Sequence, residues 1–143
     1  MTPHALDHRP LTATAHAADP ARLLRTVLRV DAAACGVLGL VLLLGADWLS
    51  TPLGLPAHWS VPFGVFLLGA AVALALIAGY RTIPRGLAWA VIALNAVCAL
   101  EMLLLPLTGW VPLTGLGTAV LVTGALAVAV FADVEYLALR RMR

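Results

Sequence analysis

Residues 61–79 read VPFGVFLLGAAVALALIAG, a stretch that carries no charged side chain from end to end. A helix of about 20 apolar residues crosses the hydrocarbon core of a bilayer, which is about 30 Å thick. Comparable stretches occupy residues 30–46, 87–105 and 113–132, and the mean hydropathy of the whole chain is +1.00. The sequence therefore predicts an all-α membrane protein whose four transmembrane helices form an antiparallel bundle.

The arginines indicate how the chain is oriented in the membrane. All nine basic residues are arginine, and they lie before the first stretch, between the second and the third, and after the fourth. The connections after the first and third stretches carry no Arg or Lys. Because short cytoplasmic connections are enriched in Lys and Arg, we expect a multi-pass plasma-membrane protein with both termini in the cytoplasm, N-in and C-in.

The sequence also suggests where the membrane domain begins and ends. Asp19-Pro20 is typical of a helix N-cap followed by proline at the first helical position. Residues 1–19 lack a continuous apolar run, which favours a disordered cytoplasmic tail over a signal peptide. We therefore expect a four-helix transmembrane domain over 20–139 and a basic cytoplasmic tail over 140–143.

Small residues indicate how the helices could meet. Lipid tails are as apolar as Leu, so helices associate in membranes through close approach at small side chains. Ala71, Ala75 and Gly79 repeat at every fourth residue and predict the contact face of the second helix. Ala32 and Gly36 do the same for the first helix.

Three polar residues within the apolar stretches form the candidate intramembrane site: Glu101, Asn95 and Asp31. Polar and ionisable groups at membrane depth are rare and mark places where packing or function is concentrated. No Arg, Lys or His lies one helical turn from Glu101, so it is expected to be protonated, to face a polar cavity or to pair across helices. Asn95 fits an interhelical hydrogen bond. A functional and a structural role both stay open for Glu101 and Asp31.

Further charged residues gather at the expected cytoplasmic rim of the bundle: Arg29, Arg81, Arg85, Asp133, Glu135 and Arg140. Neither Asp133 nor Glu135 has an arginine one turn away, so ion pairs at this rim would have to join different helices. Two interpretations follow. The rim is an ion-pair girdle that fixes the register of the helices, or it is a site for a substrate or a lipid headgroup.

Recognisable catalytic and metal-binding motifs are missing from the sequence. It contains no H-E-x-x-H, G-x-S-x-G, C-x-x-C or glycine-rich phosphate loop, and its apolar stretches hold no histidine for a haem. Cys35 and Cys98 lie inside apolar stretches, where cysteine is usually a small packing residue. We therefore expect no catalytic residue, no metal and no cofactor, and no nucleic acid as partner. Membrane lipids, a homo-oligomer or a partner membrane protein are the expected partners.

Five short motifs resemble a known group of proteins: residues 28–31 (LRVD), 53–56 (LGLP), 91–95 (VIALN), 109–110 (GW) and 131–136 (FADVEY). Through them, residues 25–141 resemble small uncharacterised four-span integral membrane proteins of actinobacteria. More distantly, the layout is similar to the DoxX-like four-helix group, some members of which accompany redox complexes. The resemblance implies the fold and leaves the activity open. Glu101 does not belong to the pattern, which implies no family-wide role for it.

Three functional hypotheses are compatible with these observations. The first is a structural or accessory membrane subunit, which accounts for the small-residue stripes, the short connections and the missing catalytic motifs. The second is a small homo-oligomeric transporter or channel that uses the intramembrane carboxylates. The third is a membrane-embedded lipid- or quinone-binding subunit or enzyme that uses the charged residues of the rim.

Overall fold

The computed structural model describes residues 20–142, and that part of the chain contains helices and no strand. The elements are α1 (Pro20–Leu44), α2 (Ala46–Leu53), α3 (Ala57–Gly79), α4 (Arg85–Thr108) and α5 (Gly115–Arg141). All of them except α2 are long and apolar enough to cross a membrane. The predicted all-α fold with four membrane-spanning helices is therefore confirmed.

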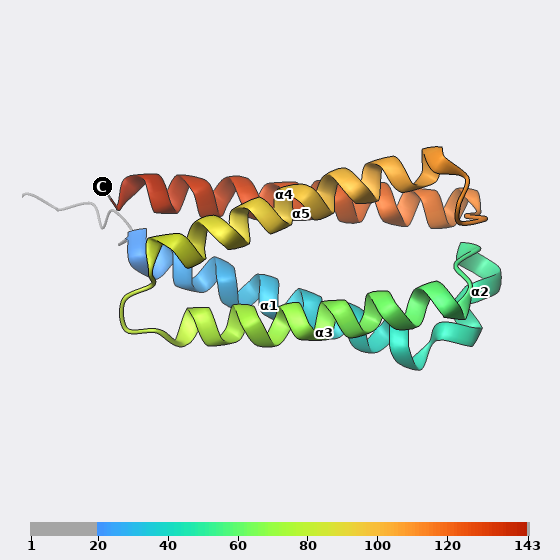
Figure 1. The fold of residues 1–143 in the computed structure, drawn as a ribbon, viewed down its shortest axis with the longest axis horizontal. Helices are drawn as coiled ribbons and strands as arrows, with labels where there is room; N and C mark the ends of the chain where they lie inside the picture. The colour runs from blue at the N-terminus through green and yellow to red at the C-terminus, as the bar shows by residue number, and fades with distance from the viewer. Residues whose placement is uncertain (1–19, 143) are drawn as a thin grey trace, which may run out of the picture.

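The four long helices form an antiparallel bundle made of two helix pairs (Figure 1). α1 packs along α3, α4 packs along α5, and the two pairs meet mainly where α1 contacts α5. The beginning of α1, the α3–α4 connection and the end of α5 lie together at one end of the bundle. α2 and the α4–α5 connection lie at the opposite end.

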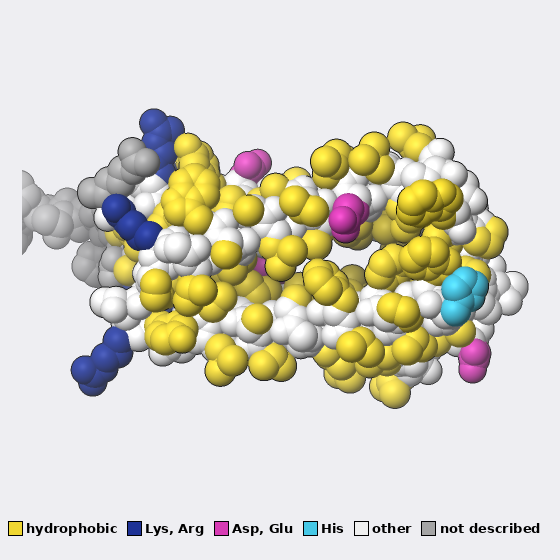
Figure 2. Space-filling model, viewed as in Figure 1, with side chains coloured by type: hydrophobic (Ala, Val, Ile, Leu, Met, Phe, Trp, Pro, Cys, Tyr) yellow, Lys and Arg dark blue, Asp and Glu magenta, His cyan; other side chains and the backbone are white. Residues whose placement is uncertain are grey.

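Positive charge distinguishes these two ends. Every arginine between residues 20 and 142 lies in the first three turns of α1, on the α3–α4 connection, at the start of α4 or in the last turn of α5. The arginine side chains visible in Figure 2 stand at this end, and the histidine stands at the other. We call the two ends the arginine end and the α2 end, and the corresponding halves of the bundle the arginine half and the α2 half.

Several boundaries differ from those expected from the sequence. The connection between α1 and α3 contains the helix α2, and α4 continues through Pro106 until Gly109 ends it in a left-handed conformation, φ 68°. A proline in the last turn removes one backbone donor, a loss that membrane helices tolerate. α5 extends to Arg141, so residues 140 and 141 end a helix, where their charge is favourable. The described part of α1 begins at Pro20, and both Asp19 and the tail 1–19 lie outside the described residues.

A core of large side chains occupies the arginine half. Leu24 and Leu28 of α1 are 1% and 0% exposed. They belong to one cluster with Leu74 and Ala78 of α3 and with residues of the other pair: Ala88, Val91 and Ile92 of α4, and Ala138 and Leu139 of α5. In this half, therefore, all four long helices pack together.

Small residues make the contacts in the α2 half. Gly39 of α1 and Gly64 of α3 lie so close that a Cβ atom on Gly64 would be 2.9 Å from the Gly39 carbonyl oxygen. At the tip, the backbone N–H of Thr114 donates to the Leu53 carbonyl oxygen at 3.0 Å, and its hydroxyl donates to Pro52 at 2.7 Å. Between this tip and the middle of the bundle, Figure 2 shows a hollow between the two helix pairs.

The predicted contact stripe on residues 61–79 is only partly correct. Ala71 faces α1, but Ala75 and Gly79 are exposed. The residues that α3 turns toward its neighbours are Gly64, Ala71 and Ala78, which recur at every seventh position. A seven-residue spacing follows one face of a helix that packs nearly parallel to its partner, whereas a four-residue spacing drifts away from that face.

Candidate functional site

Three polar side chains from three helices meet inside the bundle. Asn95 of α4 lies between Asp31 of α1 and Glu135 of α5. Its Nδ2 donates to Asp31 Oδ2 at 3.0 Å and to Glu135 Oε2 at 3.3 Å. A single amide therefore connects the α1–α3 pair to the α4–α5 pair. We call these three residues the carboxyl cluster.

Both acids of the carboxyl cluster are buried. Asp31 is 3% exposed and Glu135 is 0% exposed, and Glu135 Oε1 is a buried atom with no hydrogen-bond partner in the described structure. Within residues 20–142, the groups that act on the two carboxyls are each other, Asn95 and Cys35, and no cation is among them. An ionised carboxylate buried without a cation or sufficient donors is strongly unfavourable. The arrangement therefore cannot be explained as an ordinary buried ion pair.

Local sequence places each member of the cluster on the inner face of its helix. Glu135 shares the buried face of α5 with Ala132 and Ala138, and Asn95 lies beside the buried face of α4 that includes Ile92. Asn95 lies ten residues after the start of α4, which corresponds to about 15 Å along the helix axis. Glu135 lies six residues, or about 9 Å, before the end of α5. The cluster therefore lies at the border between the arginine half and the α2 half.

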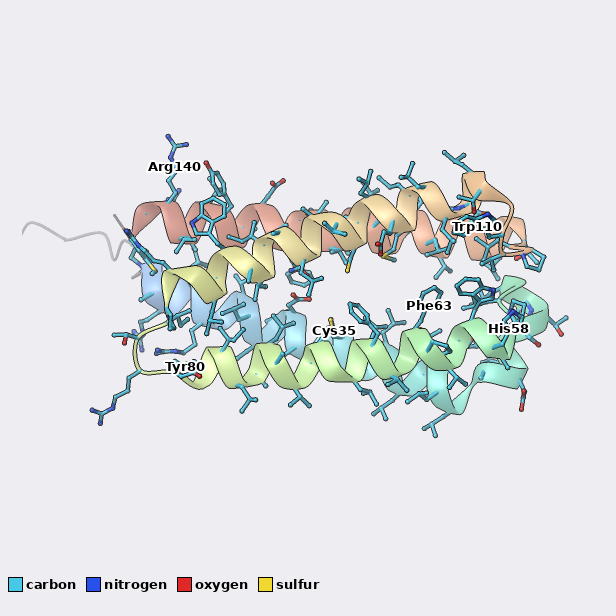
Figure 3. The ribbon with its side chains drawn as sticks, in the orientation of Figure 1. Cys35, His58, Phe63, Tyr80, Trp110 and Arg140 are labelled. Carbon is cyan, nitrogen blue, oxygen red and sulfur yellow. The ribbon has the colours of Figure 1, made fainter. Side chains whose placement is uncertain are left out.

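Cys35 extends the carboxyl cluster toward the α2 half. It lies one turn after Asp31 on α1, and its thiol donates to Asp31 Oδ1 at 3.6 Å. Cys35 is half-buried, in contrast to the two acids. Figure 3 shows its side chain in the space between the two helix pairs. The carboxyl cluster is therefore closest to exposed space at Cys35, on its side toward the α2 half.

Glu101 does not join the carboxyl cluster, although Asp31 and Asn95 do. It is exposed and makes no hydrogen bond or ion pair with any residue of the described chain. Glu101 follows Asn95 by six residues on α4, which at about 100° per residue places the two side chains about 120° apart around the helix. The three residues of the candidate intramembrane site are therefore split between an inner and an outer face.

The candidate rim site is likewise divided, because Glu135 belongs to the carboxyl cluster. The remaining members of the rim are all exposed, and none forms an ion pair with another residue between 20 and 142: Arg29, Arg81, Arg85, Asp133 and Arg140. Arginines at this end bond to backbone oxygens instead. Arg25 donates to the carbonyls of Tyr80 and Arg81 at 2.7 and 3.0 Å, and Arg85 donates to that of Met142 at 3.3 Å.

The burial of Glu135 is not evident from the sequence pattern, because residues 125–132 are apolar at every position and define no single face. In the structure, the inner face of α5 includes residues 125, 128, 132 and 135, at spacings of three and four. The predicted span ends at residue 132, which places Glu135 at the rim. Continuing the face for one more turn places Glu135 inside and its neighbour Asp133 outside, as the structure shows.

The chemistry open to the carboxyl cluster is proton binding. No group of three or more His, Cys, Asp or Glu suited to a metal ion occurs among residues 20–142, and both cysteines are free thiols. Two neighbouring carboxyls that cannot both be ionised share one proton, as catalytic carboxyl dyads do. No protein-family model, curated protein or solved structure matches the chain. The geometry of this cluster therefore carries the functional argument.

Proposed function

We propose that the protein is a small multi-pass membrane protein that transfers protons through the carboxyl cluster. The observation that supports this most is the burial of two carboxyl groups around one neutral donor, with Glu135 Oε1 left without a partner. Two negative charges at this depth would repel each other and lose their hydration. A proton on the pair removes one of these charges. The cluster therefore holds a proton at rest and releases it when water reaches it.

The two sides of the carboxyl cluster differ in their access to water. Toward the arginine end, the buried core that includes Leu28 and Leu139 closes the bundle. Toward the α2 end, half-buried Cys35 adjoins the hollow between the helix pairs. We propose that a proton arrives from the hollow and leaves toward the arginine end after the two pairs shift. The hydrogen bonds that the side-chain amide of Asn95 donates to Asp31 and Glu135 would break and re-form in that shift.

We propose that the arginine end faces the cytoplasm of the cell and that the chain lies in the plasma membrane. The charge distribution supports this orientation. Exposed rings flank the membrane at both ends, with Tyr80 and Trp89 at the arginine end and Trp48 and Trp110 at the α2 end. Four helices enclose little space, so the working form is a homo-oligomer in contact with lipid.

The orientation can be tested by thiol labelling in intact cells. In a variant without Cys35 and Cys98, a cysteine is placed at Ser50 or at Arg141, at opposite ends of the bundle. A membrane-impermeant maleimide is expected to label the cysteine at Ser50 and to reach the one at Arg141 only after the cells are permeabilised. Labelling of Arg141→Cys in intact cells would contradict the proposed orientation.

Proton transfer can be tested with purified protein in liposomes that contain a pH-sensitive dye. A potassium diffusion potential drives the flux. The wild type is expected to acidify or alkalinise the lumen according to the sign of the potential. Asp31→Asn and Glu135→Gln are expected to lower the rate at least about tenfold, since each removes a protonatable group of the cluster.

Two exposed acids provide matched controls for this experiment. Glu101→Gln and Asp133→Asn also remove one carboxyl each, on α4 and α5, and are expected to stay within about twofold of the wild-type rate because neither contacts the carboxyl cluster. A wild-type rate equal to that of empty liposomes would refute the proposal. So would equal losses in the cluster variants and the controls.

A second candidate, an accessory subunit, is favoured by the hollow in the α2 half. The hollow leaves faces of both helix pairs uncovered, and an apolar helix of a partner membrane protein would fill it. A stoichiometric partner that copurifies with an inactive wild type would support this function. A copurifying lipid or quinone in its place would support the binding-subunit hypothesis.

A further inference from the structure

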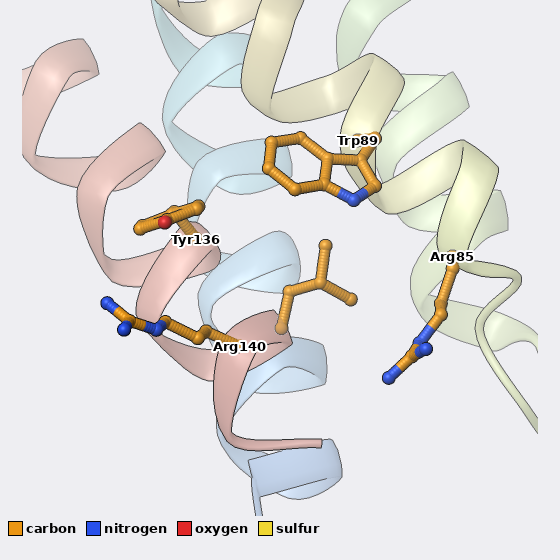
Figure 4. Close-up of a pocket in the computed structure, with 5 residues that line it drawn as sticks. Arg85, Trp89, Tyr136 and Arg140 are labelled. Carbon is orange, nitrogen blue, oxygen red and sulfur yellow. The ribbon is translucent and has the colours of Figure 1, made fainter. Parts of the chain in front are cut away.

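A small pocket opens on the surface of the arginine end, between the start of α4 and the last turns of α5. It has a volume of about 60 Å³ and is lined by Arg85 and Trp89 of α4 and by Tyr136, Leu139 and Arg140 of α5. Figure 4 shows Arg85 and Arg140 on opposite sides of the pocket, with Trp89 and Tyr136 above the space between them. A volume of this kind corresponds to roughly four water molecules at about 15 Å³ each, which is enough for a phosphate group.

Four of the five described residues that line the pocket carry a hydrogen-bond donor, and none of the five is acidic. Arg140 makes no hydrogen bond or ion pair within residues 20–142, and Arg85 has one bond of 3.3 Å to a carbonyl oxygen. Figure 4 shows the indole nitrogen of Trp89, which can only donate, on the ring edge nearest Arg85. The acid on the same face of α5, Asp133, precedes Arg140 by two helical turns, or about 10 Å along the axis.

The rings make one wall of the pocket apolar. Trp89 and Tyr136 meet edge to face, with their centroids 5.7 Å apart and their planes at 60°. They are 48% and 38% exposed, and both lie within two turns of a helix end. Tryptophan and tyrosine at such positions lie at the level of the lipid headgroups. Arginines beside them reach the phosphate layer, while the rings contact the upper part of the acyl chains.

The second cavity at this end differs in its lining. It measures about 140 Å³ and is lined by Arg25 and Arg81 but by no aromatic ring. One nitrogen of the Arg25 guanidinium donates to two backbone carbonyls, at 2.7 and 3.0 Å, and fixes the α3–α4 connection against α1. The pocket at Arg85 and Arg140 combines two arginines with a ring pair, which the second cavity lacks.

We propose that the pocket formed by Arg85, Trp89, Tyr136 and Arg140 binds the phosphate of an anionic phospholipid. The two guanidinium groups hold the phosphate oxygens from both sides, and the ring pair supports the glycerol and the first acyl carbons. The site is separate from the carboxyl cluster and does not depend on proton transfer. A phosphate ion has the same headgroup chemistry but makes no contact with the rings.

Native mass spectrometry of the full-length protein tests this site. The protein is titrated with phosphatidylglycerol, with phosphatidylcholine of the same acyl chains, and with inorganic phosphate. The wild type is expected to retain one phosphatidylglycerol at concentrations where it retains neither of the others. Arg85→Gln/Arg140→Gln is expected to weaken phosphatidylglycerol binding about 25-fold, or about fivefold for each arginine. The double variant Arg22→Gln/Arg141→Gln removes the same charge from the same end and is expected to stay within about twofold, because neither arginine lines the pocket.

Other outcomes would overturn the proposal. Equal retention of the two phospholipids would show that the pocket does not select an anionic headgroup. Equal losses in both double variants would show that Arg85 and Arg140 do not form the site. Equal binding of inorganic phosphate would show that the rings do not recognise the rest of the lipid. If Arg85→Gln/Arg140→Gln does not fold, the single variant Arg140→Gln decides, because this side chain makes no bond within the described structure. It is expected to weaken phosphatidylglycerol binding about fivefold, and an unchanged affinity would overturn the proposal.

Discussion

The arginine half and the α2 half of the bundle are held together in different ways. In the arginine half, large side chains such as Leu24 and Leu28 are buried between the helix pairs. In the α2 half, Gly39 and Gly64 join α1 to α3, and hydrogen bonds at the tip join α2 to α5, but the pairs stand apart. The carboxyl cluster lies at the border between the core of large side chains and the half in which the two helix pairs stand apart. A small change in the angle between the pairs there would change how water reaches the two acids.

The largest expected effect on stability comes from the loss of Asn95, which links the α1–α3 pair to the α4–α5 pair. Asn95→Leu removes the donor that Asp31 and Glu135 share, so two buried carboxyls lose a hydrogen bond with nothing to replace it. We expect the free energy of unfolding to fall by about 3 kcal/mol. Reversible unfolding in mixed micelles, followed by tryptophan fluorescence, measures the change.

A triple variant separates the cost of unpaired acids from lost packing. Replacing Asp31, Asn95 and Glu135 together by Leu removes the polar groups as well as the donor. Buried charged groups can often be replaced by apolar residues at no loss, so the stability is expected to return to within about 1 kcal/mol of the wild type. A stable Asn95→Leu protein, or a triple variant as unstable as Asn95→Leu, would contradict this account.

The next effect tests the core of the arginine half. Leu28→Ala deletes a side chain that is 0% exposed and leaves a cavity among all four long helices. We expect a loss of about 2 kcal/mol, since the lining atoms lose their packing contacts. Leu126→Ala is the control in the same unfolding assay, because this residue is 60% exposed and faces lipid. A loss as large at Leu126 would show that burial does not distinguish the two sites.

A smaller effect tests the close contact in the α2 half. In Gly64→Ala the new Cβ would meet the Gly39 carbonyl oxygen at 2.9 Å and Leu43 Cγ at 2.7 Å, which forces α1 away from α3. We expect a loss of about 1–2 kcal/mol. Gly69→Ala changes the same helix where nothing lies within 4 Å, and it is expected to leave the stability unchanged or higher. Equal results for the two variants would disprove the close contact.

The smallest expected effect on stability tests the hydrogen bonds at the α2 end, where the start of α5 contacts α2. Thr114→Val removes the hydroxyl that donates to Pro52 at 2.7 Å and accepts from the Gly117 N–H at 3.0 Å. The stability is expected to fall by about 1 kcal/mol, and the α2 end is expected to open. Spin labels on α2 and α5 would report the opening as a longer and broader distance. Thr118→Val, which loses no hydrogen bond of the described structure, should change neither the stability nor the distance.

The features predicted correctly from the sequence are those that local composition determines. The length and hydropathy of 61–79 and of the other stretches identify the four spans. The rotation of each helix about its own axis is not determined in this way. Every face of 61–79 is apolar, so periodicity cannot show that Gly64 rather than Ala75 meets α1.

The carboxyl cluster was only partly predictable for the same reason. The depth of Asp31 and Asn95 follows from the chain, but the side chains that meet them depend on how α1, α4 and α5 pack. Glu101 lies within the span α4, and only the packing shows that it is exposed and stays apart from Asp31 and Glu135. A hydropathy pattern gives positions along the membrane normal, and the tertiary contacts give positions within the membrane plane.

The most direct test of the proposed function is infrared spectroscopy of the protein in lipid bilayers at neutral pH. The carbonyl stretch of a protonated carboxyl is separate from that of a carboxylate. The wild type is expected to show such a band in the apolar environment of the carboxyl cluster. The band should be lost in Asp31→Asn/Glu135→Gln and retained in Glu101→Gln. A wild type without the band, or a band that survives in the double variant, would contradict the claim that the buried pair holds a proton.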